Sequence, residues 1–462
     1  MASPIEDQHM KIIEELCVLP DGDNYILYAP LRRTILRVNQ DVVALLLKIK
    51  AGKELPKDEL TLRAIENLRS LKIIDSEDSF PVDVTSNNEY KPTNVTFLPT
   101  SDCNLKCIYC YADSGTLSKY LSVHIAKAAI DFVFHNARER NIPKVQIGFL
   151  GGGEPFLAWR FVKDIFEYSH SKSDEFDIST YFTGVTNGML SREQTLWISK
   201  NFQYLNVSVD GTQAVHDKHR PTKSNKGSFE RVLKTLTTLN DQGFRYGVRS
   251  TISSLSVDYM TSIVEFFAEL GVSRIHFEPL FACGRCRTNS KLAPAPKVFI
   301  DNFIKCLSIA QSTETDLFCS AIRLDTLSST FCGALNNNFY ITPEGYVTSC
   351  TEVSLVDEPL SSTFFIGKYD QSAKGFVFWD NRRNLLTSRT VLNMPKCSKC
   401  IAKWHCAGAC PVKAAYEGDL FDATRLANCE IARELTEYHI RTLASGEANY
   451  LPRVHSQSIV PT

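Results

Sequence analysis

The sequence has no long apolar run and almost no net charge, and each absence excludes a class of function. No stretch of about 18 apolar residues occurs, and the N-terminal MASPIEDQHM is acidic and polar rather than basic and then apolar. Lysine and arginine together number 51 against 52 acidic residues, so bulk charge gives no reason to expect a polyanionic partner. We therefore expect a cytoplasmic protein that binds neither a membrane nor nucleic acid.

The chain also lacks the features of a disulfide-bonded protein. Its 15 cysteines are an odd number, and no secretion signal precedes them. Instead, ten of them fall into two groups: the triplet Cys103, Cys107 and Cys110, and seven cysteines between Cys332 and Cys429. Such close spacing favours metal ligation over disulfide bonding.

The triplet favours iron over zinc. Three thiolates within eight residues can each bind one iron of a four-iron cluster, which leaves the fourth iron open to chelate a small molecule. A C-x2-C pair such as Cys397 and Cys400 is also typical of zinc, but zinc sites usually take ligands in two pairs, and the triplet has no nearby fourth ligand. We therefore predict an iron-sulfur enzyme.

The first 91 residues predict a small module with a winged-helix-like pattern. Residues 22–39 contain two β-rich runs around a turn, and an apolar helix is expected over residues 42–49. Pro56 suits the first position of a second helix. Residues 87–94 are a plausible linker out of this module.

From Asn94 the pattern changes to six strands, each followed by a helical pattern. The expected strands cover residues 93–100, 145–152, 179–187, 204–211, 246–253 and 274–281. This alternation predicts parallel strands with right-handed helical crossovers, in an open doubly wound sheet or a partial barrel. Ligands of such folds bind at the C-terminal strand ends, where Cys103, Gly152, Asn187 and Asp210 lie.

After Gln311 the alternation stops. The rest of the chain is turn-rich and dense in cysteine up to a helix expected from Ala423 to Leu443. Because this region has so little periodic apolar sequence, we expect bound clusters to order it and chelation to unfold it.

The segment CNLKCIYCY resembles the cluster motif of the radical S-adenosylmethionine (SAM) superfamily, C-x3-C-x2-C with an aromatic residue, here Tyr109, before the last cysteine. The resemblance continues in GGGEP at residues 151–155, after the second strand, where this family holds the amino group of SAM. It implies that Gly152 and Gly153 let the backbone approach SAM, and that Glu154 accepts a hydrogen bond from its ammonium.

Further matches to this family are VTNG at 185–188, SVDG at 208–211 and HDKHRP at 216–221. They imply that Ser208 binds the SAM ribose, that Arg220 binds the SAM carboxylate, and that Asn187 and Asp210 lie beside the cofactor. The residues themselves leave alternatives open. Asn187 and Asp210 each precede a glycine, as in an ordinary turn, and Arg220 could be a solvated surface charge.

The resemblance also implies a reaction type. In this family the reduced cluster passes one electron into the sulfonium of SAM, which releases methionine and a 5′-deoxyadenosyl radical. That radical abstracts a hydrogen from a strong C–H bond, so the protein contributes orientation and exclusion of water. An electron donor such as flavodoxin or ferredoxin is implied as a partner.

The seven C-terminal cysteines resemble a SPASM domain, which in this family carries two auxiliary four-iron clusters and would bring the total to three. The resemblance implies one auxiliary cluster on Cys397, Cys400, Cys406 and Cys429, and three corners of the other on Cys332, Cys350 and Cys410. The fourth ligand of that second cluster stays open. Cys319 is a candidate, and the alternative is an open iron that binds substrate. We expect the further C-x2-C pair, Cys283 and Cys286, to be structural.

SPASM-bearing radical enzymes act mostly on peptides or protein side chains, and the N-terminal module resembles the PqqD-type element that captures the leader of a precursor peptide by adding a strand to its sheet. We therefore expect a maturase that forms a thioether or carbon–carbon cross-link in a ribosomally synthesised precursor peptide. The expected fold class is α/β. The expected domains are a PqqD-type module at 1–91, a partial (βα)6 radical SAM barrel at 92–312, a SPASM domain at 313–443 and a C-terminal tail at 444–462.

Other functions fit the same motifs. An anaerobic sulfatase maturase oxidises Cys or Ser to formylglycine with an Asp as base, directly after the cysteine equivalent to Cys350. Here Thr351 stands at that position and Glu352 follows, which weakens this alternative. Glu352 is a candidate base for another reaction. A peptide epimerase, and an iron-sulfur or zinc scaffold without catalysis, are the remaining alternatives.

Overall fold

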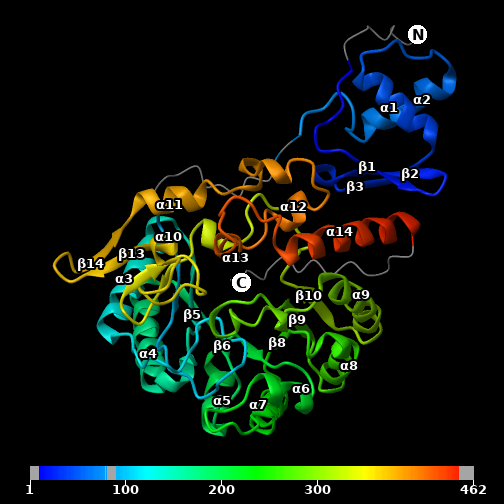
Figure 1. Ribbon diagram of the computed structural model, residues 1–462. Helices are drawn as coiled ribbons and strands as arrows, with labels where there is room; N and C mark the ends of the chain where they lie inside the picture. Colours follow the sequence, from blue (N-terminus) through cyan, green and yellow to red (C-terminus); the bar gives the residue numbers. More distant parts are fainter. Residues whose placement is uncertain (1–9, 79, 81–89, 447–462) are drawn as a thin grey trace.

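A computed structural model describes residues 10–78, 80 and 90–446 of the chain. Its largest feature is one eleven-stranded sheet with the strand order β10-β9-β8-β7-β6-β5-β4-β11-β12-β13-β14 (Figure 1). The seven strands from β4 to β10 are parallel, and they are β4 (Asn94–Phe97), β5 (Lys144–Phe149), β6 (Ser179–Thr186), β7 (Tyr204–Ser208), β8 (Tyr246–Ile252), β9 (Arg274–Pro279) and β10 (Asp316–Cys319). The six expected strands are therefore confirmed as β4 to β9, in a parallel sheet.

Helices follow these strands, as the alternation predicts. They are α3 (Val123–Glu139), α4 (Trp159–Phe176), α5 (Arg192–Asn201), α6 (Gln213–His219), α7 (Phe229–Asp241), α8 (Met260–Glu269) and α9 (Pro296–Ser312). Local signals define the start of α5. The Ser191 side chain accepts from the backbone N–H of Gln194, and the Gln194 side chain accepts from the backbone N–H of Ser191, so the two residues form a capping box. The apolar faces of the helices pack on the sheet and form the main core.

The cysteine-rich region contributes four more strands to the same sheet. They are β11 (Tyr340–Ile341), β12 (Tyr346–Thr348), β13 (Phe365–Asp370) and β14 (Gly375–Phe378). β11 pairs in parallel with β4, and the pairs from β11 to β14 are antiparallel. The sheet therefore contains strands from both sides of residue 312, which is the expected boundary between the second and third domains.

The N-terminal module has its own small sheet and core. Its elements are β1 (Cys17–Asp21), β2 (Asn24–Ala29), β3 (Thr34–Val38), α1 (Gln40–Lys50) and α2 (Glu59–Ser70). The prediction that Pro56 begins the second helix is wrong: Asp58 caps that helix by accepting from the backbone N–H of Thr61 at 2.9 Å. Residues 87–89 of the predicted linker at 87–94, and residues 447–462 of the predicted tail at 444–462, lie outside the described residues.

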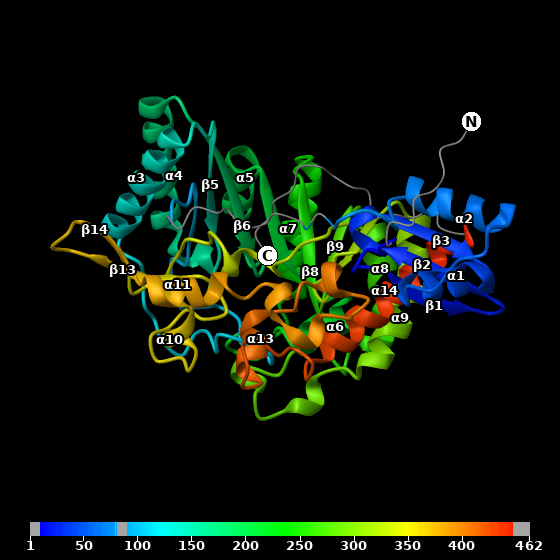
Figure 2. The same cartoon turned by 90° about the horizontal axis from the view of Figure 1, so that it is seen from above.

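This module lies beside α14, one of the C-terminal helices, in both views (Figures 1 and 2). The helices of this region are α10 (Ser361–Phe364), α11 (Asp380–Thr387), α12 (Lys403–Cys406), α13 (Pro411–Tyr416) and α14 (Ala427–Ser445). Glu15 accepts from Lys403 Nζ at 2.5 Å and from Trp404 Nε1 at 2.9 Å, and Tyr28 Oη lies 2.7 Å from His405 Nε2. The module is therefore anchored to the cysteine-rich region. Within the described residues, no helix is long and apolar enough to span a bilayer.

Candidate functional site

The cysteine triplet lies in the loop that follows β4. Burial is the main cause that raises the pKa of the Cys107 thiol to about 12, and the Cys110 and Cys103 thiols contribute to this rise, so the three thiols lie close together. Two of the sulfur atoms accept hydrogen bonds, Cys103 Sγ from Asn187 Nδ2 at 3.6 Å and Cys110 Sγ from the backbone N–H of Ser114 at 3.4 Å. Converging sulfurs that accept from N–H groups fit the thiolate ligands of an iron-sulfur cluster.

The glycine-rich loop after β5 packs closely against the cysteine loop. A Cβ on Gly153 would lie 1.9 Å from the carbonyl oxygen of Asp102, and a Cβ on Gly152 would lie 2.8 Å from Ser354 Oγ. The backbone N–H of Glu154 donates to the same Asp102 oxygen at 2.8 Å. Gly153 therefore lets the β5 loop approach the cysteine loop, and Gly152 lets it approach Ser354 of the cysteine-rich region.

Glu154, the expected acceptor for the SAM ammonium, is only 3% exposed and already accepts three hydrogen bonds. Its Oε1 accepts from Thr186 Oγ1 at 2.8 Å and from the backbone N–H of Phe156 at 3.3 Å, and its Oε2 accepts from the backbone N–H of Asn187 at 2.7 Å. Burial raises its pKa to about 7, against the lowering effect of these donors. Because a carboxylate offers about four acceptor positions, one is left for a ligand.

Asn187 connects the end of β6 with the cysteine loop. Its Nδ2 donates to Asn104 Oδ1 at 2.7 Å as well as to Cys103, and its Oδ1 accepts from the backbone N–H of Met189 at 2.9 Å. Asn187 thus makes a local turn and a contact with the cluster loop at the same time. Ser208 is the half-buried last residue of β7, at the same end of the sheet.

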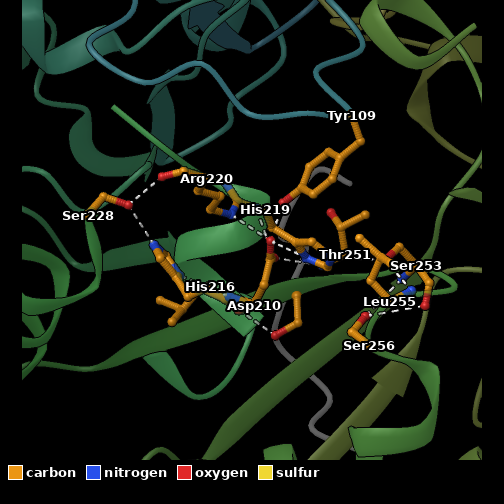
Figure 3. Close-up of polar contacts among 12 residues, drawn as sticks. Tyr109, Asp210, His216, His219, Arg220, Ser228, Thr251, Ser253, Leu255 and Ser256 are labelled. Carbon is orange, nitrogen blue, oxygen red and sulfur yellow. Dashed lines mark hydrogen bonds and ion pairs between the residues drawn. The ribbon is translucent and has the colours of Figure 1, made fainter. Parts of the chain in front are cut away.

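Asp210 is wholly buried, and its carboxylate is one centre of the polar contacts drawn in Figure 3. Arg220 forms a bidentate pair with it, Nε to Oδ2 at 3.0 Å and Nη2 to Oδ1 at 3.1 Å. The Tyr109 hydroxyl donates to Oδ2, and His219 Nδ1 lies 3.1 Å from that atom. Burial alone would raise the pKa of Asp210, but Arg220 and His219 hold it well below its usual range. Arg220 is therefore a buried ion-pair partner and not a solvated surface charge.

His216 is a buried residue of this site to which the sequence analysis gave no role. Its Nδ1 accepts from the backbone N–H of Asp210 at 3.3 Å, and its Nε2 lies 3.0 Å from Ser228 Oγ (Figure 3). Ser228 Oγ in turn donates to the carbonyl oxygen of Arg220 at 2.6 Å. The segment HDKHRP holds both His216 and His219. Their spacing of three residues on α6 was the signal in the sequence that both could face the same site.

Arg285, in the loop after β9, holds the cysteine loop from another direction. Its Nη1 donates to the carbonyl oxygen of Cys107 at 2.7 Å, and its Nη2 donates to that of Ser114 at 2.8 Å. The two cysteines around it, Cys283 and Cys286, are buried. Sequence reasoning missed Arg285 because it is far from the triplet along the chain, and no local pattern links the two.

Cys332, Cys350 and Cys410 form a second group. Burial raises the pKa of Cys410 to about 12, and Glu352 and Cys332 contribute to the rise. Burial likewise raises the pKa of Cys350, and Glu352, Cys410 and Cys332 act on it in the same direction. Glu352 therefore lies among these three thiols, and its buried Oε2 has no hydrogen-bond partner within the described part of the chain.

Cys397, Cys400, Cys406 and Cys429 form a third group. Burial is the main cause that raises the pKa of Cys406 to about 12, and the other three thiols contribute to this rise. Cys17 of the N-terminal module also lies near this group, since Glu15 and Cys400 add to the effect of burial on its pKa. Nowhere in residues 10–78, 80 and 90–446 do three His, Cys, Asp or Glu side chains form a site for a single metal ion.

The chain resembles known proteins over part of its length. A sequence model of the Radical SAM superfamily matches residues 97–261. The serine-type anaerobic sulfatase-maturating enzyme of Bacteroides thetaiotaomicron is 26% identical over 41% of this chain and 47% of that protein. The sporulation killing factor maturation protein SkfB of Bacillus subtilis is 24% identical over 59% of this chain and 63% of that protein. Across the curated relatives, the chain spans 43% to 63% of their length.

Solved structures share the fold. Native anSMEcpe with bound AdoMet has a TM-score of 0.63 at 18% identity, over 77% of this chain and all of that chain. Streptococcus suis SuiB bound to precursor peptide SuiA has a TM-score of 0.50 at 14% identity, over 91% of this chain and all of that chain. The superfamily match includes the cysteine triplet that follows β4. The chain carries a radical SAM superfamily domain over residues 97–261.

Proposed function

We propose that this protein is a maturase of ribosomally synthesised precursor peptides, in which hydrogen abstraction by a SAM-derived radical leads to a thioether or carbon–carbon cross-link. The observation that carries the proposal is the convergence of ten cysteines in three groups, one beside the Asp210 network and two in the C-terminal region. Support also comes from SkfB, which is named as a maturation protein, and from SuiB, which has been solved with a precursor peptide.

Three four-iron clusters are proposed for the three cysteine groups. The cluster on the triplet would supply the radical chemistry by reductive cleavage of bound SAM. Toward that SAM, the chain offers the remaining acceptor position of Glu154 for the ammonium, Arg220 for the carboxylate and Ser208 for the ribose. The pair with Asp210 uses Nε and Nη2 of Arg220 and leaves Nη1 outside it. The ion pair therefore orients the guanidinium and leaves N–H donors for the SAM carboxylate.

The fourth ligand of the cluster on Cys332, Cys350 and Cys410 is open to test. Cys319 is buried at the end of β10. Burial raises the pKa of its thiol to about 12, and the charged groups that also act on this pKa are Glu278 and Lys413. If Cys319 binds iron, Cys319→Ser changes the spectrum of one auxiliary cluster. An unchanged spectrum and unchanged iron content would favour the open iron instead.

We propose that the N-terminal module binds the leader of the precursor peptide. Its three-stranded sheet has two edge strands, β1 and β3, whose outer backbone groups could pair with an extended peptide. The contacts of Glu15 and Tyr28 tie this sheet to α12, so a leader on either edge would be held next to the cysteine-rich region.

Co-expression with the small open reading frame next to the gene tests the function directly. Mass spectrometry of that peptide is expected to show a loss of two hydrogens per cross-link. A peptide of unchanged mass that takes up deuterium from solvent would favour epimerisation. The matched control is Cys107→Ala, which is expected to abolish 5′-deoxyadenosine production while sparing most of the iron. Zinc in place of about 12 irons per chain after anaerobic reconstitution would overturn the proposal.

Formylglycine formation is the second candidate function, because the fold is similar to anSMEcpe and a curated relative is a sulfatase-maturating enzyme. Thr351 takes the place of the expected base, but the unpartnered Oε2 of Glu352 is a candidate proton acceptor. Turnover of Glu352→Gln should fall. Glu358→Gln serves as the control, because the Glu358 carboxylate accepts from the backbone N–H of Ser354. Unchanged turnover of Glu352→Gln would remove Glu352 from the mechanism.

A further inference from the structure

The loop from Cys406 to Cys410 joins the second and third cysteine groups, and its backbone is unusual. Ala407, Gly408 and Ala409 have φ angles of +49°, +81° and +58°, so three consecutive residues are left-handed. Each alanine in this conformation costs about 1–2 kcal/mol, so surrounding contacts must hold the loop in place.

Arg389 supplies those contacts. Its side chain is fully buried, and its Nη2 donates to the carbonyl oxygen of Gly408 at 2.7 Å, while its Nη1 donates to that of Ala409 at 3.1 Å. Its Nε donates to the carbonyl oxygen of Leu420 at 2.5 Å. The guanidinium is therefore fixed in one orientation beside the loop that carries Cys406 and Cys410 at its ends.

The charge of Arg389 has no carboxylate to balance it in the described part of the chain. Of the four lysines and arginines that are buried there, the other three pair with carboxylates: Arg220 with Asp210, Lys403 with Glu15, and Lys413 with Glu278. A buried cation without an anionic partner is strongly unfavourable, so an anionic partner is expected at this position.

The cysteines at both ends of this loop would provide that partner as thiolates, once they bind iron. Burial lowers the pKa of Arg389, and the groups that raise it are Cys410 and Cys332 of one group and Cys406 and Cys397 of the other. Arg389 thus lies between the two cysteine groups and acts on both. Thiolate-bound clusters at these two sites would bring the negative charge that the buried guanidinium lacks.

We propose that Arg389 is a shared counter-cation of the two auxiliary clusters, which fixes the loop between them and raises the reduction potential of both. The inference rests on the proposed function, because that function assigns clusters to these cysteines. A fixed positive charge nearby favours the more negative, reduced form of each cluster, and the buried position limits screening by solvent.

The test uses the full chain, reconstituted anaerobically, with iron analysis and an EPR-monitored redox titration. Arg389→Gln keeps polar groups beside the loop but removes the charge. Both auxiliary clusters are expected to become harder to reduce, with at least a tenfold fall in the reduced-to-oxidised ratio at a given potential, which corresponds to 59 mV for one electron. The cluster on Cys103, Cys107 and Cys110 is expected to keep its potential.

Two further variants make the result decisive. Arg382→Gln is the matched control, because Arg382 is a half-buried arginine of α11 that also donates to backbone carbonyls, those of Ser361 and Phe365. It is expected to leave all potentials unchanged. Arg389→Lys keeps the charge without the planar fork, and is expected to restore most of the shift, and to load both clusters even if Arg389→Gln does not.

Several outcomes would overturn the inference. Full iron loading of Arg389→Gln with unchanged auxiliary potentials would exclude a charge effect. Failure of both Arg389→Gln and Arg389→Lys to load the auxiliary clusters would limit Arg389 to holding the backbone. A parent protein that binds no iron at the seven C-terminal cysteines would instead contradict the proposed function itself, so the two failures are distinguishable.

Discussion

At the scale of single residues, the site depends on groups whose protonation is fixed by their partners. His216 is an example, because it accepts from the backbone N–H of Asp210 at Nδ1. Nδ1 must therefore be unprotonated, and the proton of the neutral ring is on Nε2, which faces Ser228 Oγ. Burial lowers the pKa of His216 to about 4, so the ring stays neutral where a free histidine would be charged.

This shift predicts a pH dependence of stability. The unfolded chain binds a proton at His216 near pH 6.5, whereas the folded chain does so only near pH 4, so stability falls as the pH falls through this window. His216 should contribute about 2 kcal/mol to the loss of unfolding free energy between pH 7 and pH 5. Urea unfolding of His216→Asn should show a correspondingly shallower pH profile. The exposed His135→Asn is the control, and parallel profiles for parent and His216→Asn would contradict the assignment.

At the scale of elements, the close approach of two loops explains the glycine-rich motif. A Cβ on Gly153 would overlap the carbonyl oxygen of Asp102 at 1.9 Å, so Gly153→Ala must push the β5 loop away from the cysteine loop. We expect reduced iron at the triplet and a loss of SAM cleavage, with a destabilisation of about 1–3 kcal/mol. Gly375→Ala in β14 is the control, because its Cβ would meet only Ala373 O at 3.7 Å. Equal SAM cleavage by the two variants would refute this account.

Elements that depend on local sequence were predictable, and those that depend on distant partners were not. Strands β4 to β9 follow from apolar runs, and the capping box of Ser191 from two residues three apart. β11 is only two residues long, and it forms because β4, far away in the sequence, offers it a free edge. The cysteine triplet is likewise local, whereas Arg285 and Arg389 reach their carbonyl partners only through the tertiary fold.

At the scale of the whole molecule, one buried ion pair helps to attach the N-terminal module to the cysteine-rich region. Glu15 accepts from Lys403 and Trp404, and the side chains of Glu15 and Lys403 are only 14% and 8% exposed. Glu15→Ala would leave Lys403 buried without its carboxylate, at a cost of about 3–5 kcal/mol. We expect faster hydrogen exchange in β1 to β3 and in α12. The control is Arg37→Ala, which breaks an exposed pair with Asp21 in the same module.

Removal of iron should divide the C-terminal region into two parts, because only one of them belongs to the sheet. The strands β11 to β14 have backbone partners and pack in the main core, so they should stay protected in the apoprotein. Residues 388–429 hold five of the seven C-terminal cysteines, four in turns and short helices and Cys429 in the first turn of α14, so they should exchange rapidly once the metal is gone. Hydrogen exchange with mass spectrometry, before and after anaerobic chelation, measures both parts in one experiment. Equal loss of protection in 340–378 and 388–429 would mean that the clusters, and not the shared sheet, order the whole region.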